Sequence, residues 1–171
     1  MKEIIINEHN LEDKDIDSVV RRAKLVVENS KGELLLVKCH DNCYLIGGHV
    51  DGDEIDNDTL IREIREEAGV DFDPAVSEPF YRIVYYTKDY PQEGINTKYI
   101  ANYYDVIYDL EPDEGNLDLT GDEAEGDFHL VYIPKDKILD EINEVYKTCT
   151  RKNVVKDTLD VIEEYLKKIG F

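Results

Sequence analysis

The chain has 171 residues, the size of one globular domain, and 42% of them are apolar, enough for a sizeable core. Forty acidic and twenty basic residues give a net charge of −20, so we expect neither a nucleic-acid nor a membrane partner. No apolar run approaches the roughly 18 residues of a membrane span, and the first residues do not form a signal peptide. The three cysteines, an odd number, argue against a disulfide framework and favour a cytoplasmic protein with buried or incidental thiols.

The first half of the chain contains extended segments and one helix. Residues 21–27 and 34–39 are rich in β-branched and apolar side chains around an Asn-Ser-Lys-Gly turn, which predicts strand, turn and strand. A shorter strand is expected at 44–46, before a glycine pair. Over 56–68 the apolar residues recur at helical spacing, and this pattern predicts a helix.

The ends of this helix carry their own signals. Asp56 or Asp58 can cap its N-terminus, and Gly69 is available to end it.

The second half is expected to complete a mixed sheet. Three segments rich in Tyr, Ile and Val predict strands: 80–87, 97–108 and 128–133. Between the last two, 111–127 holds eight acids and no bases and is expected to be a solvated loop. Pro134 should open a helix at 135–147, and a C-terminal helix with an apolar stripe is expected at about 151–169. Strands followed by helices predict a mixed sheet packed between helices, a compact α+β or α/β sandwich.

Three glutamates on the first helix are the clearest candidates for chemistry. Glu63, Glu66 and Glu67 are spaced i, i+3 and i+4, which places three carboxylates within one turn of each other. Their repulsion would be offset by a hard divalent cation, which prefers oxygen ligands. A solvated acidic helix face would account for the three residues equally well.

The residues before the helix favour the metal interpretation. The pair Gly47-Gly48 lets backbone carbonyls approach a ligand or a metal closely. Glu54 and Arg62 carry opposite charges across the loop-to-helix transition, and their pairing would fix the loop against the helix.

The segment 48–70 resembles the signature of the Nudix hydrolases (MutT-like), Gly-x5-Glu-x7-Arg-Glu-U-x-Glu-Glu-x-Gly-U, where U is a bulky aliphatic residue. Here Gly48 is followed after five residues by Glu54, and after seven more by Arg62-Glu63-Ile64-Arg65-Glu66-Glu67-Ala68-Gly69-Val70. Every fixed position of the signature is present. The resemblance implies a single Nudix domain over 1–171, folded as an α/β/α sandwich around a mixed β-sheet.

The resemblance also implies roles for these residues. Glu66 and Glu67 would be metal ligands, joined by the carbonyl of Gly47 or Gly48. Glu63 would be a metal-site carboxylate or the general base that deprotonates water. Glu54 would hold the loop through Arg62, and a second metal could reach it through water.

Residues outside the signature complete the expected site. In this family a further carboxylate commonly comes from a loop before the last strand, and Glu123 and Glu125 are both candidates. Related proteins place a phosphate or base contact near Arg22, although a surface arginine would look the same. Lys98 and Tyr99 could each reach the substrate, because alternate residues of a strand face opposite sides.

Taken together, the resemblance implies a hydrolase dependent on Mg²⁺ or Mn²⁺ that cleaves the pyrophosphate bond of a nucleoside diphosphate linked to another moiety. Two alternatives remain open: a metabolite sensor or regulator of the same fold without turnover, and a protein interaction scaffold. The apolar positions of the C-terminal helix could be buried in the monomer or form a homodimer. The particular substrate depends on loops outside the signature.

Overall fold

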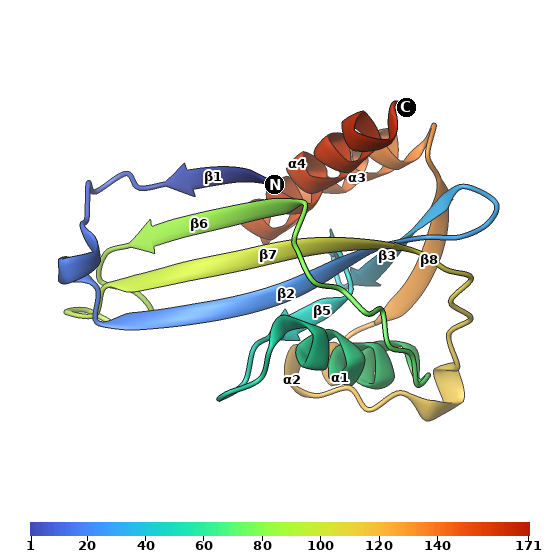
Figure 1. Cartoon of the computed structure of the whole chain (residues 1–171), viewed down its shortest axis with the longest axis horizontal. Helices are drawn as coiled ribbons and strands as arrows, with labels where there is room; N and C mark the ends of the chain where they lie inside the picture. The colour runs from blue at the N-terminus through green and yellow to red at the C-terminus, as the bar shows by residue number, and fades with distance from the viewer.

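An eight-stranded mixed sheet forms the centre of the protein, and helices cover both of its faces (Figure 1). The structure, a computed structural model, describes residues 1–171 with the exception of the side chain of Asp122. The strands are β1 (Lys2–Ile6), β2 (Ser18–Glu28), β3 (Glu33–Cys39), β4 (Asn42–Tyr44), β5 (Gly47–His49), β6 (Tyr81–Thr87), β7 (Thr97–Ile107) and β8 (His129–Pro134). The helices are α1 (Asp56–Ala68), α2 (Gly121–Glu125), α3 (Ile138–Thr148) and α4 (Lys152–Ile169), with 3-10 turns at Asp13–Asp15 and Glu114–Asn116.

The sheet combines parallel and antiparallel pairs. Its order is β1-β6-β7-β2-β3-β4, with β5 paired to β2 and β8 paired to β3. The pairs β1/β6 and β2/β7 are parallel, and the other pairs are antiparallel. The long strand β2 therefore lies between β7 on one side and the hairpin partners β3 and β5 on the other, which brings the glycine pair of β5 to the middle of the sheet.

Side chains on β2 divide the core into two layers. Ala23, Leu25 and Val27 belong to the cluster under α1, whereas Val26 belongs to the cluster under α3 and α4. This alternation follows from the two-residue period of a strand. In Figure 1, α1 and α2 lie on one side of the sheet and α3 and α4 on the other. The α/β/α sandwich with a mixed sheet is confirmed.

The C-terminal helix uses its apolar stripe within the monomer. Val155, Leu159 and Ile162 of α4 are buried in the same cluster as residues of β6 and β7. All three cysteines are free and buried, as expected for thiols that pack as small apolar groups. No helix in the described part of the chain is both apolar enough and long enough for a membrane span.

Helix α1 begins and ends where the pattern predicts, but the predicted cap is wrong. The N-cap residue is Ile55, without a side-chain cap. The Asp56 carboxylate instead accepts hydrogen bonds from Arg21 (2.5 Å), Asn102 (2.6 Å) and Tyr104 (2.8 Å), so it fastens the helix to β2 and β7. Gly69 ends the helix in the left-handed region at φ 70°, as expected.

Several other boundaries of strands and helices differ from the prediction, mostly because of how the strands pair. The expected strand at 44–46 is divided between β4 and β5, because β4 pairs with β3 and β5 pairs with β2. Pro134 ends β8 and does not open a helix, since it lies opposite Glu33 in the ladder. The acidic stretch 111–127 is not a simple loop: it contains the second 3-10 turn and α2. Strand β1 was not predicted, and it is held by parallel pairing with β6.

Candidate metal and phosphate site

Two carboxylates of α1 face the glycine pair of β5. Glu67, only 1% exposed, accepts a hydrogen bond at Oε2 from the backbone N–H of Gly47 at 2.8 Å. Glu63 lies one helical turn earlier, and its Oε1 would be 2.1 Å from a Cβ placed on Gly48. Because a side chain at that position would displace the carboxylate, the approach of Glu63 requires glycine there.

The third glutamate of the signature points elsewhere. Glu66 is adjacent to Glu67 in sequence, and consecutive helical residues are about 100° apart around the axis. The side chain of Glu66 is 36% exposed, and its Oε2 is 3.4 Å from Nη1 of Arg62. Accordingly, no group of three or more His, Cys, Asp or Glu residues with described side chains is gathered closely enough to hold a metal ion.

Arg62 is the hub that joins the loop to the helix. Its guanidinium donates to both oxygens of Glu54 at 3.0 Å and to Oε1 of Glu63 at 2.7 Å. It also donates to the backbone carbonyl of His49 at 2.8 Å. The pairing expected between Glu54 and Arg62 is therefore present, and the same arginine fixes the position of Glu63.

The Glu54–Arg62 pair predicts an acid-dependent loss of stability. The hydrogen bonds from Arg62 lower the pKa of Glu54 from its usual 4.5 to about 2. A lowered folded-state pKa stabilises the protein above the unfolded value, and this contribution disappears as pH falls through the folded value. We expect Glu54→Gln to reduce the free energy of unfolding by about 1 kcal/mol at pH 6 and to have progressively less effect between pH 4.5 and pH 2. Urea titrations of both proteins at several pH values measure this difference, and a constant difference would contradict the prediction.

Lys24 brings a positive charge to the same place. Its Nζ donates a hydrogen bond to the carbonyl of Gly47, the residue opposite it in the β2/β5 ladder. The ammonium is also 5.3 Å from the centre of the Tyr44 ring. The hydroxyl of Tyr44 donates to Oε1 of Glu123 at 3.3 Å. One lysine therefore contacts both the glycine carbonyl of β5 and the tyrosine that binds Glu123 of α2.

Burial and charge act against each other in this cluster. Desolvation raises the pKa of Glu67 and lowers that of Lys24, while the attraction between the two opposes both shifts. Desolvation also raises the pKa of Glu66, with a further contribution from Glu63. Because burial makes the ionised forms of these carboxylates unfavourable, an additional cation beside them would stabilise the site.

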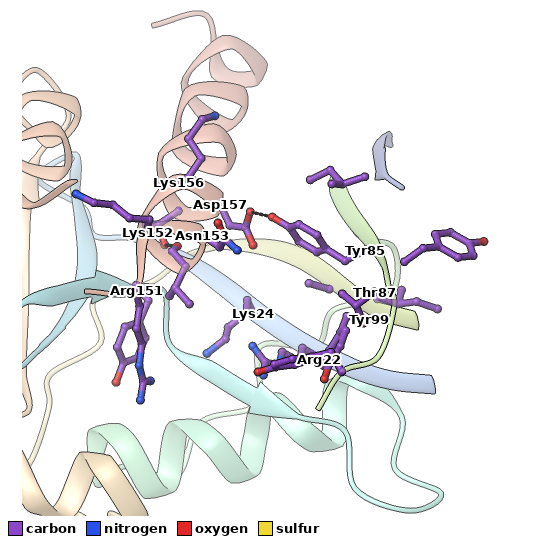
Figure 2. A pocket seen from close by; sticks show the side chains of 18 of the residues that line it. Arg22, Lys24, Tyr85, Thr87, Tyr99, Arg151, Lys152, Asn153, Lys156 and Asp157 are labelled. Atoms are coloured by element: carbon purple, nitrogen blue, oxygen red, sulfur yellow. Dashed lines mark hydrogen bonds between the residues drawn. The ribbon is translucent and has the colours of Figure 1, made fainter. Parts of the chain in front are cut away.

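A cavity of about 1040 Å³ opens next to this cluster, between the sheet and the start of α4 (Figure 2). Lys24, Tyr44 and Leu45 line its end nearest β5, and tyrosines of β6 and β7 line the sheet. Counted among the described residues, its lining includes six of the twenty lysines and arginines but two of the forty acids. The six are Arg22, Lys24, Lys88, Arg151, Lys152 and Lys156. In a chain of charge −20, this concentration of cations would favour an anion in the cavity over one elsewhere on the surface.

The residues expected to contact the substrate are only partly brought together. Arg22 and Tyr99 line the cavity, and Nε of Arg22 donates to Nε2 of His49 at 3.3 Å. Lys98 is not among the lining residues, because it faces the other side of β7 and its Nζ is 2.7 Å from Asp13. Of the two loop candidates, Glu123 approaches the cluster through Tyr44, whereas Glu125 is exposed at the end of α2.

The residues around β5 fit a divalent cation. They offer hard oxygen donors, which such ions prefer: two carboxylates of α1 and a glycine carbonyl. The Gly47 carbonyl already accepts from a cation, the ammonium of Lys24. Any residue larger than glycine at position 48 would occupy the space in which the carboxylate of Glu63 lies.

Sequence reasoning missed Lys24 and Tyr44. The signal for Lys24 was its position as the single charged residue inside the apolar run Ala23–Val27, where a lysine needs a partner. Tyr44 gave no signal, because it is one of twelve tyrosines and its contact with Glu123 joins residues 79 positions apart.

Comparisons with known proteins identify the family and the fold of the chain. The chain matches the NUDIX domain family over residues 19–152. A Nudix hydrolase structure from Nitrosomonas europaea is similar with a TM-score of 0.55 and 19% identity, covering 87% of this chain and 89% of that chain, which shows a shared fold. MutT from Methanosarcina mazei Go1 has a TM-score of 0.49 and 16% identity, over 88% of this chain and 96% of that chain. The Ap4A hydrolase of C. elegans has a TM-score of 0.46 and 15% identity, over 88% and 98%. No curated protein sequence matches the chain.

Proposed function

The chain belongs to the NUDIX family of pyrophosphohydrolases, and from this premise we propose that it uses Mg²⁺ or Mn²⁺ to cleave the diphosphate bridge of a nucleoside diphosphate linked to a further group. One observation supports this most directly. Lys24, which lines one end of a cation-rich cavity in a strongly acidic chain, bonds to the same glycine of β5 that binds the buried Glu67. Carboxylates and cations placed together in this way suit a metal and a polyphosphate that bind side by side.

The metal would be held by oxygens of α1 and β5. Glu67, Glu63 and the carbonyl of Gly47 are the nearest donors, and Glu66 and Glu123 could join them by side-chain rotation. When bound, the ion would neutralise charge on the diphosphate and favour ionisation of water. Glu66 is free to rotate because its side chain is partly exposed and its contact with Arg62 is long.

The protein residues would orient water and substrate. Glu63 has one oxygen fixed by Arg62 at 2.7 Å, and its other oxygen would either bind the metal or, as general base, accept a proton from water. Arg22 and Lys24 would attract the phosphates from the cavity side. With no tryptophan in the chain, a cavity tyrosine such as Tyr85 or Tyr99 would stack on the base.

The decisive experiment is a hydrolysis screen with Mg²⁺ or Mn²⁺, read by mass spectrometry. The panel contains nucleoside triphosphates, ADP-ribose, NADH, dinucleoside polyphosphates, nucleotide sugars and coenzyme A. We expect one class to be cleaved at its diphosphate bridge and the cleavage to stop when EDTA is added. Failure to cleave any of them, together with a higher melting temperature in the presence of one compound, would instead indicate a sensor that binds without turnover.

A further inference from the structure

Lys24 lies between the carboxylates of α1 and the cavity. Its Nζ donates to the carbonyl of Gly47, while the N–H of the same glycine donates to Glu67. Lys24 is also part of the cavity lining, and Figure 2 shows its side chain extending from β2 on the sheet side of the cavity. A single side chain therefore reaches both the metal site and the space for substrate.

The ammonium of Lys24 occupies a position that the proposed divalent ion would take. The Gly47 carbonyl that it contacts is a donor for the proposed metal. The N–H of that same residue donates to the buried carboxylate of Glu67. Lys24 thus brings a positive charge to the glycine that also binds the buried Glu67.

Joint contact of a lysine ammonium and a divalent ion with this one carbonyl oxygen is disfavoured, because their charges repel strongly at such a distance. The lysine side chain has four flexible carbons and can change rotamer without moving the strand. The open space next to it is the cavity, where the neighbouring cation is Arg22, two residues away on the same face of β2. Phosphate oxygens in the cavity would offset the repulsion between these two cations.

We propose that Lys24 is a resident counter-ion that the divalent metal displaces from the carbonyl of Gly47, and that the displaced ammonium then binds a phosphate of the substrate in the cavity. This inference rests on the proposed function, because it requires a metal at the carboxylate cluster. It has a thermodynamic consequence. In the free protein the metal must displace Lys24, and this cost lowers the affinity for the metal. When a phosphate binds the displaced ammonium, the cost is offset. Metal and phosphate therefore strengthen each other's binding.

The test measures Mn²⁺ affinity by electron paramagnetic resonance, without turnover, in the parent protein and in Lys24→Met. Lys38→Met is the matched control, because Lys38 is also half-buried and loses the same charge but pairs with Glu141 of α3. We expect Lys24→Met to bind Mn²⁺ alone at least about tenfold more tightly than the parent protein, and the control to differ by no more than about twofold. Circular dichroism checks the fold, and Lys24→Gln serves if the Met variant is unfolded.

A second arm repeats the titrations with methylenediphosphonate, a diphosphate analogue that is not hydrolysed. In the parent protein the analogue should increase Mn²⁺ affinity, and in Lys24→Met this increase should be at least about fivefold smaller. Equal or weaker Mn²⁺ binding by folded Lys24→Met would overturn the role of Lys24 while leaving the proposed function intact. Absence of Mn²⁺ binding by both proteins at millimolar concentration would overturn the metal site itself and this inference with it.

Discussion

Replacement of Glu67 by glutamine is expected to lower kcat/KM at least about a hundredfold, the loss typical of a disturbed metal site, while the protein remains folded. Glu67 is the most buried carboxylate of the signature and accepts a hydrogen bond from Gly47. The amide oxygen of glutamine can accept that same hydrogen bond, so the local backbone keeps its partner. The neutral side chain is also less costly to bury than a carboxylate. The substitution therefore removes a charge for metal binding without opening a cavity.

The matched control for this prediction is Glu125→Gln. Glu125 carries the same charge and was also a candidate ligand, but it is exposed at the end of α2. Steady-state kinetics on the substrate found in the screen should show a small change for this variant, and thermal melting should show both variants folded. A Glu67→Gln enzyme with near-parent activity would mean that the buried carboxylate is structural only.

Local patterns account for the parts of the site that sequence alone could predict. The period of apolar residues predicts α1, and helical spacing then places Glu63 and Glu67 on one face. The Glu54–Arg62 pair also follows from local spacing, because it joins a loop to the helix that follows directly. Such features depend on residues within one or two turns of each other.

The unpredicted parts depend on contacts between distant segments. Asp56 looks like a helix cap, yet its carboxylate is taken by three donors from β2 and β7, which no local pattern reveals. Lys24 meets Gly47 only because β2 and β5 pair in one particular register. The approach of Glu123 of α2 to the site depends likewise on a distant residue, Tyr44 of β4.

The distribution of charge has the same origin. The net charge of −20 predicts that the surface as a whole repels anions. Folding nevertheless collects cations from β2 and from the start of α4 around one cavity (Figure 2). An anion that approaches the protein is therefore favoured at one place and opposed at most others.

Gly47→Ala is expected to cost at least about 3 kcal/mol of stability, the largest effect of any single substitution proposed for this site. Gly47 has a φ of 118°, in the region that side chains disfavour. A Cβ there would also lie 2.3 Å from the backbone oxygen of Ala23 and 3.0 Å from the Cα of Lys24. Neither contact can be relieved by rotating a side chain, so β5 would have to separate from β2.

Gly52→Ala is the control that separates the steric clash expected at Gly47 from the cost of a positive φ alone. Gly52 also has a positive φ, 52°, but a Cβ there would meet nothing within 4 Å. We expect this control to lose only about 1 kcal/mol, the ordinary cost of the left-handed conformation. Guanidinium unfolding measures both variants against the parent protein. Equal losses would show that β5 can move away from β2 at little cost, and the carboxylates of α1 would then lack the rigid glycine backbone on which the proposed metal site depends.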